Sequence, residues 1–371
     1  MSLIAARRYS SCMHGSTSAG ASGGPDHLVD RHPTVSPERL IAQLRPPPTF
    51  AGVSFATYRP DPAEPTQAAA VVACQDFCRQ AIERRAGRRK LLGRREILPG
   101  VGLYLDGGFG VGKTHLLASA YYRLPGEGPG GAPDSRAPKA FATFGELTQL
   151  AGVFGFVECI DLLANYTAVC IDEFELDDPG NTTLIARLLS SLVERGVSVA
   201  ATSNTLPGQL GEGRFAAQDF LREISTLARI FTTVRIEGPD YRHRGLPPAP
   251  QPLSDDEVAA RAARIDGATL DNFDTLCAHL ATMHPSRYLT LIEGVSAVFL
   301  TGVHGIDDQN VALRLVSLTD RLYDAGIPVV ASGAKLDTIF SEEMLAGGYR
   351  KKYLRATSRL LALTAAANPA R

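Results

Sequence analysis

The sequence predicts an α/β protein in which a parallel sheet is flanked by helices. Three apolar runs, at 101–106, 168–171 and 197–202, have the length and continuity of strands buried on both faces. The first run leads into a glycine-rich loop and a helix, the second into two carboxylates, and the third into Asn204. Because the carboxyl ends of parallel strands meet at one edge, these polar groups are expected to share one crevice.

Residues 107–114 read GGFGVGKT, which is the spacing of a phosphate-binding loop. Glycine-rich backbone can turn its amide N–H groups inward around an anion, and the helix that follows adds its positive N-terminal end. Lys113 is expected to reach the β- and γ-phosphates, and the Thr114 hydroxyl to bind Mg²⁺. An ordinary glycine-rich turn is the alternative. The predicted ATP-binding residues are Gly107, Gly108, Phe109, Gly110, Val111, Gly112, Lys113 and Thr114.

Two carboxylates, Asp172 and Glu173, follow the second apolar run. At the end of a buried strand, Asp172 is expected on the Mg²⁺ side and Glu173 as the base that polarises the attacking water. Taken alone, such a pair is as often a solvated loop. Asn204, after the third run, is expected to position that water, with a turn residue before Pro207 as the alternative.

Composition excludes several function classes. The formal net charge is −1, so no global field attracts the chain to nucleic acid, although arginines at 84–95 form a local basic stretch. No apolar stretch has the length of a membrane span, and no secretory signal is evident, so a cytoplasmic location is expected. The six cysteines contain no C-x-x-C pair and are interpreted as reduced thiols.

The chain divides into three parts by composition. Residues 1–50 are expected to be a disordered tail, although the first 25 also overlap in composition with a mitochondrial transit peptide. Residues 51–245 carry the phosphate loop and form the predicted P-loop ATPase domain. After a Pro-rich linker, residues 246–371 again show a pattern of strand, helix and strand. Ser254 and Glu257 predict a capping box at the start of a helix in this region. This C-terminal α/β region lacks a phosphate loop, so it is expected to regulate or dock.

Arginines beyond Asn204 are candidates for a finger that reaches a neighbouring subunit's γ-phosphate. Arg214, Arg222 and Arg229 lie on or near one predicted helix. Each one alone is more often solvent-facing.

The assembled segments resemble the ZapE family of bacterial cell-division ATPases, which has mitochondrial relatives. They run from about Ser54 to Leu360 and read SFATYRPDPAEPTQ, GLYLDGGFGVGKTHLL, VCIDEFELDD, TSNTLPGQL, PDYRHR, RLYDAGIPVVASG and RATSRL. The resemblance implies an AAA+ type ATPase that binds ATP with Mg²⁺, assembles into rings and acts on division or membrane-associated protein partners. A peripheral site on the matrix side of the mitochondrial inner membrane is the alternative location.

The family's catalytic roles carry over to Lys113, Thr114, Asp172, Glu173 and Asn204. Two departures matter. Where the family has a GL-x-R run after the sensor, this chain reads GEGRF, so Arg214 is our choice for the finger, with Arg222 behind it. The second sensor arginine of AAA+ proteins has no obvious counterpart, and the candidates are Arg242, Arg244, Arg355 and Arg359.

The sequence thus predicts an ATPase that converts ATP and water to ADP and phosphate. Two alternatives stay open. A P-loop kinase of a small molecule would share the phosphate loop but would not need Glu173 beside Asp172. An ATP-dependent binding switch would hold the nucleotide with little turnover.

Overall fold

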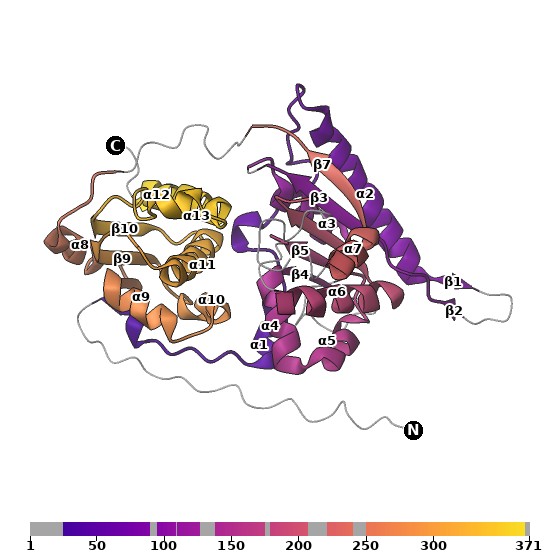
Figure 1. The fold of residues 1–371 in the computed structure, drawn as a ribbon, viewed down its shortest axis with the longest axis horizontal. Helices are drawn as coiled ribbons and strands as arrows, with labels where there is room; N and C mark the ends of the chain where they lie inside the picture. The colour runs from indigo at the N-terminus through magenta and orange to yellow at the C-terminus, as the bar shows by residue number, and fades with distance from the viewer. Residues whose placement is uncertain are drawn as a thin grey trace.

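The computed structural model describes residues 25–89, 95–108, 110–126, 138–174, 179–206, 221–239 and 250–367. Within these residues the chain forms two lobes, each built on its own parallel sheet (Figure 1). We call them the N-terminal lobe, with strands β3 to β7, and the C-terminal lobe, with strands β8 to β10. A two-stranded antiparallel pair, β1 (Arg88–Arg89) and β2 (Arg95–Glu96), projects from the N-terminal lobe.

The N-terminal lobe contains a five-stranded parallel sheet in the order β4-β5-β6-β3-β7. Its strands are β3 (Gly102–Gly107), β4 (Lys139–Thr143), β5 (Ala168–Asp172), β6 (Ser198–Ser203) and β7 (Phe231–Ile236). The fold class predicted from the sequence, α/β with a parallel sheet, is confirmed. Because β5, β6 and β3 are neighbours, their carboxyl ends lie side by side. The phosphate loop, the acid pair and Asn204 follow these three strands directly.

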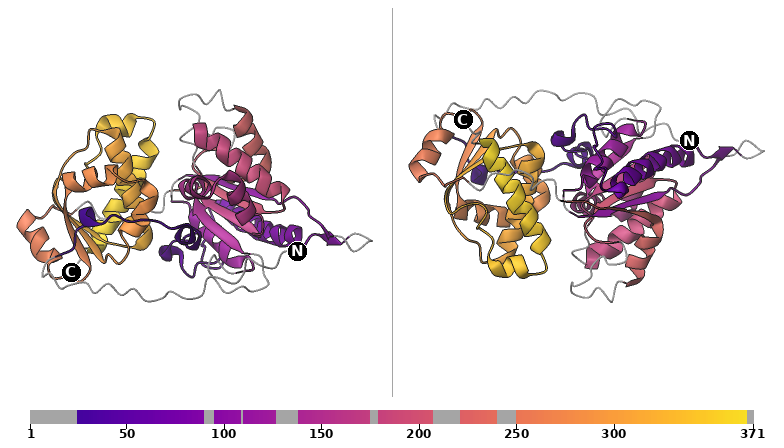
Figure 2. Two further views of the ribbon diagram at one scale, coloured as in Figure 1. Left: turned by 90° about the horizontal axis from the view of Figure 1, so that it is seen from below. Right: turned by 90° about the horizontal axis from the view of Figure 1, so that it is seen from above.

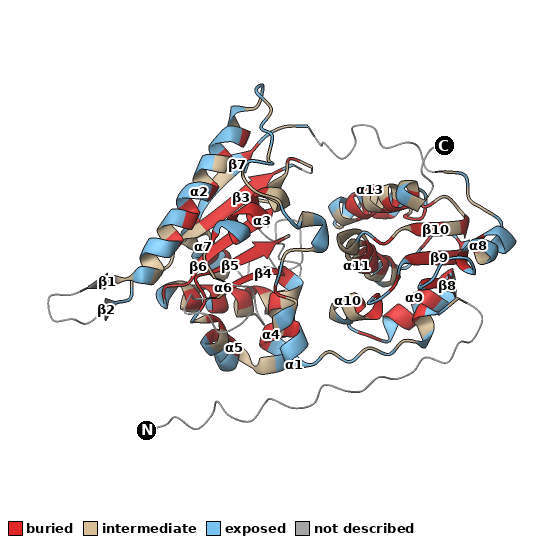
Figure 3. Ribbon diagram, turned by 180° about the vertical axis from the view of Figure 1, so that it is seen from behind, coloured by how far each residue is buried: buried red, intermediate tan, exposed pale blue. Residues whose placement is uncertain are grey.

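Helices cover both faces of this sheet because the strand residues alternate between two cores. On β5, Val169 and Ile171 belong to one hydrophobic cluster, and Ala168 and Cys170 to the other. The first face is covered by α1 (Pro37–Ala42), α4 (Phe144–Phe154), α5 (Phe156–Leu163), α6 (Pro179–Glu194) and α7 (Leu221–Ile230). The second face is covered by α2 (Pro65–Ala86) and α3 (Lys113–Arg123). β3, β4, β5 and β6 are accordingly buried along almost all of their length, as Figure 3 shows in red, whereas the edge strand β7 is partly exposed.

The C-terminal lobe has a three-stranded parallel sheet in the order β10-β9-β8. Its strands are β8 (Ala268–Asn272), β9 (Ala297–Val303) and β10 (Val329–Gly333). The larger core lies under α9 (Phe273–Ala281), α10 (Tyr288–Leu291), α11 (Gln309–Ala325), α12 (Glu342–Ala346) and α13 (Arg350–Ala367), with the turn η6 (Pro285–Arg287) beside it. On the opposite face packs α8 (Asp255–Ala262), which begins with the predicted capping box of Ser254 and Glu257.

Residues 25–50 differ from the disordered tail expected for 1–50. They contain η1 (Leu28–Asp30), α1 and η2 (Pro48–Phe50). Leu28 is fully buried in the C-terminal core, whereas Leu40 on α1 is buried in the N-terminal core. This segment therefore connects the two lobes by packing into both, and it runs along them in indigo in Figure 1. Residues 1–24 lie outside the described part of the chain.

The two lobes meet through α11 and α13, which lie on the inner side of the C-terminal lobe (Figure 2). Arg321 on α11 forms an ion pair with Glu146 on α4 at 2.9 Å. Lys351 Nζ on α13 donates to the backbone oxygen of Asn204 at 3.1 Å. These contacts place α11 and α13 against the edge where the strands of the N-terminal sheet end.

Candidate functional site

The glycine-rich loop begins at the end of β3 and leads directly into α3, whose first residue is Lys113. Gly110 and Gly112 have φ values of 69° and 87°, a backbone region that other residues adopt only with strain. A Cβ on Gly112 would lie 2.6 Å from the ring of Tyr58, which also donates from its hydroxyl to the oxygen of Val111 at 2.9 Å. Local conformation and close packing both explain the glycine at 112. Phe109 lies outside the described residues.

Lys113 links the loop to the neighbouring strand end. Its Nζ donates to the backbone oxygens of Gly107 at 2.8 Å and Gly108 at 2.5 Å, and to Asn204 Oδ1 at 2.9 Å. The ammonium therefore lies inside the loop, where phosphate oxygens are expected. Asn204, which follows the neighbouring strand β6, lies beside it.

Thr114 and Asp172 form the second link across the sheet edge. Thr114 Oγ1 donates to Asp172 Oδ1 at 3.1 Å, and Thr202 Oγ1 on β6 donates to the same oxygen at 2.5 Å. Burial raises the pKa of Asp172 to about 6, and the adjacent Glu173 carboxylate adds to this rise. A hydroxyl and a carboxylate side by side are the hard oxygen donors that Mg²⁺ takes, so this donor set fits that ion.

Glu173 has an unusual backbone conformation. It is the one non-glycine residue with positive φ, at 53°, in the described part of the chain. Its N–H donates to Thr202 Oγ1 at 3.0 Å, and the next N–H, of Phe174, donates to the oxygen of Thr202 at 2.7 Å. Such strain persists only where surrounding contacts hold it, and it is frequent at functional sites.

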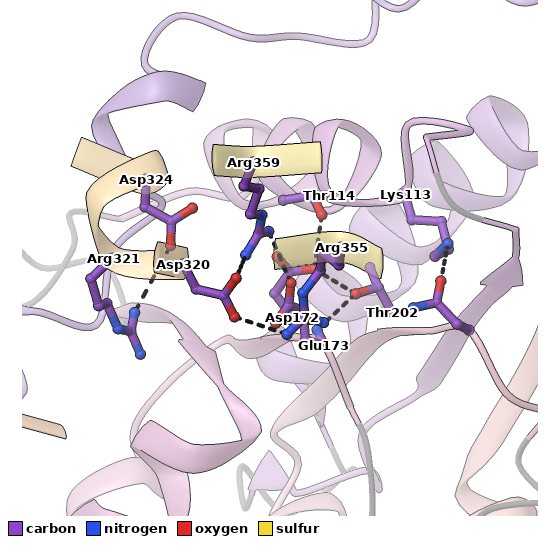
Figure 4. A network of polar contacts seen from close by, with 11 residues as sticks. Lys113, Thr114, Asp172, Glu173, Thr202, Asp320, Arg321, Asp324, Arg355 and Arg359 are labelled. Carbon is purple, nitrogen blue, oxygen red and sulfur yellow. Dashed lines mark hydrogen bonds and ion pairs between the residues drawn. The ribbon is translucent and has the colours of Figure 1, made fainter. Parts of the chain in front are cut away.

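The Glu173 carboxylate points toward the C-terminal lobe (Figure 4). Its Oε2 lies 3.2 Å from Arg355 Nη1, and its Oε1 accepts from Arg359 Nη2 at 3.0 Å. Both arginines also pair with Asp320 on α11. The two guanidiniums are thus shared between one carboxylate of each lobe. They had been candidates for the second sensor, and the structure places them against the expected base.

The finger candidates that the structure describes, Arg222 and Arg229, are not part of this cluster. Arg214, the first choice, lies outside the described residues, as do Arg242 and Arg244. Arg222 and Arg229 are exposed on α7. The identity of the finger arginine therefore stays a prediction.

Comparison with known proteins supplies the family. The model of the family described as AFG1-like ATPase matches residues 34–254 and 246–371, which is most of the sequence. The chain belongs to this family.

Relatives of this AFG1-like ATPase include the cell division protein ZapE of Escherichia coli K12. The two are 29% identical over 279 residues, covering 66% of this chain and 74% of ZapE. Lactation elevated protein 1 homolog B of Danio rerio is 24% identical over 242 residues, or 55% of this chain and 47% of that protein. Among solved structures, domain III of the Thermotoga maritima replication initiation protein DnaA is 20% identical to this chain with a TM-score of 0.35. The match covers 52% of this chain and 69% of that structure.

These findings confirm the ZapE-like assignment made from the sequence. As a member of this family, the chain is a nucleotide-binding ATPase. Among the helices that the structure describes, none combines the length and apolar character needed to cross a membrane.

Beside the acid pair of this AFG1-like ATPase lies a cavity of about 530 Å³ between the lobes. Its wall includes Asp172 and Glu173 from the N-terminal lobe, and Asp320, Arg321 and Arg359 from the C-terminal lobe. The described residues of the phosphate loop are not part of its wall. Asp172 therefore contacts both the phosphate loop, through Thr114, and the wall of this cavity.

Sequence reasoning missed Thr202 and Asp320. Thr202 is two residues before Asn204 at the end of a strand, and that position was the available signal, but threonine is common in strands for other reasons. Asp320 lies in an amphipathic helix of the other lobe, where a charged residue carries no local signal. Only the packing of α11 and α13 brings it to Glu173.

Proposed function

We propose that this protein hydrolyses ATP to ADP and phosphate at the edge formed by β3, β5 and β6. One observation carries the proposal. Lys113 and Asn204 are in contact, Thr114 and Asp172 are in contact, and Glu173 is adjacent to Asp172. Phosphate binding, metal binding and a base are the three needs of phosphoryl transfer to water, and this arrangement supplies a residue for each.

The chain's own groups have the following parts in this proposal. The loop amides and Lys113 Nζ hold the β- and γ-phosphates, and the positive end of α3 points at the same place. Thr114 Oγ1 and a carboxylate oxygen of Asp172 would hold Mg²⁺, which neutralises charge on the phosphates when bound. Glu173 accepts a proton from the attacking water, and the amide of Asn204 orients that water.

Assembly belongs to the proposal as well. A finger arginine, with Arg214 as first choice and Arg222 behind it, would reach the γ-phosphate of a neighbouring subunit in a ring. ZapE is by its name a cell division protein, and this similarity supports a protein partner in the division machinery or at a membrane surface. A cytoplasmic location suits the bacterial relative, and the matrix side of the mitochondrial inner membrane is the alternative.

A second candidate function is an ATP-dependent binding switch with little turnover. The ion pairs from Arg355 and Arg359 to Glu173 favour it, because both carboxylate oxygens of the expected base are already engaged by guanidiniums.

Phosphate release from ATP without any acceptor tests the proposal. The parent protein should release phosphate, and Glu173→Gln should bind ATP equally well while turnover falls by about 10²–10⁴. Glu194→Gln, at the exposed end of α6, is the matched control and should behave like the parent. Equal turnover in parent and Glu173→Gln would remove Glu173 as the base. Phosphate transfer that requires a small-molecule acceptor would instead favour a kinase.

A further inference from the structure

Two arginines of the C-terminal lobe hold the expected base of the N-terminal lobe. Arg355 and Arg359 are four residues apart on α13, so both side chains leave the same face of the helix. Their side chains are only 7% and 12% exposed, and each one takes a different oxygen of Glu173. Neither carboxylate oxygen is left without a charged partner.

Asp320 on α11 keeps these arginines within their own lobe. Arg355 Nη2 donates to Asp320 Oδ2 at 2.8 Å, and Arg359 Nη1 donates to Oδ1. Burial opposes ionisation of Asp320, but the two guanidiniums outweigh it and hold its pKa below the usual value. The Arg359 guanidinium also lies over the ring of Tyr323, 5.2 Å from its centre.

Two guanidiniums engage the carboxylate that is expected to act as the base. Arg359 Nη2 donates to Oε1, and Arg355 Nη1 lies 3.2 Å from Oε2, so charge-assisted contacts occupy both oxygens. A water placed at the γ-phosphate would therefore find Glu173 already engaged. In the arrangement described here, proton transfer to Glu173 first requires loss of the Arg355 and Arg359 contacts.

Asp320 lowers the cost of separating these arginines from Glu173. Removing one partner from a buried ion pair is normally destabilising, because the other charge is left uncompensated. Here Asp320 retains both guanidiniums when Glu173 is released. Two further contacts, Arg321 to Glu146 and Lys351 to the backbone of Asn204, span the same interface, so the contact with Glu173 depends on how the whole lobe docks.

We propose that the C-terminal lobe is a built-in brake, in which Arg355 and Arg359 hold Glu173 in a resting state and hydrolysis requires their withdrawal with Asp320. This proposal rests on the proposed ATPase function and adds its regulation. In this proposal the C-terminal lobe restrains ATP hydrolysis, and the docking of α11 and α13 against the N-terminal lobe sets the basal rate of turnover.

The experiment loosens the brake without touching the base. Glu146→Gln and Arg321→Gln each remove the interface ion pair, and Glu146→Gln can keep the capping of α4 because an amide oxygen can still accept from Thr143 N–H. Basal kcat for ATP should rise by about fivefold or more, which is the low end of typical coupling between sites. KM for ATP should stay unchanged, and Glu223→Gln on α7 is a carboxylate control outside this interface that should leave basal kcat unchanged.

Direct variants of the brake complete the test. Arg355→Gln and Arg359→Gln should also raise basal kcat, and Arg359→Lys should lie closer to the parent because it keeps the charge. Unchanged or lower kcat in the two interface variants, with parental thermal unfolding, would overturn the brake. In that case a loss of kcat in Arg359→Gln would assign the arginine to charge stabilisation.

Failure of the brake is distinct from failure of the proposed function. Adding Glu173→Gln to each loosened variant should abolish the gain in turnover. If parent and Glu173→Gln turn over equally, the assigned base fails, whatever the interface variants do.

Discussion

At the scale of single residues, Thr202 organises the acid pair. One hydroxyl donates to Asp172 and accepts from the backbone N–H of Glu173. The first contact orients an oxygen that is expected to hold Mg²⁺, and the second holds Glu173 in its positive φ. A residue without charge or nucleophilic chemistry thus positions the two residues to which the chemistry is assigned.

Thr202→Val should test this positioning, because valine keeps the shape and removes the hydroxyl. We expect ATP binding close to that of the parent and a fall in kcat of about 10- to 100-fold, the cost of one or two lost hydrogen bonds to charged or buried groups. Thr202→Ser, which keeps the hydroxyl, should retain most of the activity. Steady-state kinetics that determine KM and kcat separately test this role of Thr202. An unchanged kcat in the valine variant would contradict it.

At the scale of elements, α11 concentrates charge on the side that faces the other lobe. Asp320, Arg321 and Asp324 are consecutive or one turn apart, and all three are largely buried. Burial raises the pKa of Asp324 to about 7, while Arg359 and Arg321 oppose the rise and Glu173 and Asp320 add to it. The stability contributed by this helix should therefore depend on pH.

Asp324→Asn should remove a pH dependence of folding. Since the folded pKa of Asp324 is raised from 3.8 to about 7, the folded state binds a proton more tightly than the unfolded state. The stabilisation that this bound proton brings to the folded state is fully present below pH ~4 and is lost as pH rises toward ~7. The asparagine variant should thus gain in free energy of unfolding relative to the parent between pH 5 and pH 8.

Urea unfolding at several pH values measures this difference. Asp266→Asn, at an exposed position, is the matched control and should leave the pH profile unaltered. A constant offset between Asp324→Asn and the parent across this pH range would contradict the assignment.

At the scale of the whole molecule, the two lobes meet at the edge that is proposed to be catalytic. The N-terminal lobe supplies the phosphate loop and the acid pair, and the C-terminal lobe supplies the charges that meet Glu173. Residues 25–50 pack into both lobes, which ties the lobes together by a second route. The proposed ring would add a third set of contacts, in which a finger arginine reaches the nucleotide of a neighbouring subunit.

Nucleotide-dependent assembly should be visible in the Glu173→Gln protein, which is expected to bind ATP without consuming it. Its sedimentation coefficient should increase when ATP and Mg²⁺ are added. The double variant Lys113→Ala, Glu173→Gln should stay at the smaller value, because the phosphates lose their ammonium partner. Identical sedimentation of Glu173→Gln with and without ATP would argue against a nucleotide-dependent ring.

The sequence by itself determined the α/β class and the loop from Gly107 to Thr114. It also determined that Asp172, Glu173 and Asn204 meet at one sheet edge. These features are local, since glycine spacing, strand periodicity and strand-end polarity are written in short stretches of chain. The tertiary structure alone decided that two arginines of the other lobe, held by Asp320, contact Glu173. It also decided that residues 25–50 pack into both lobes and do not form a disordered tail. Such contacts join residues almost 190 positions apart, and no local pattern encodes which buried charge will face which.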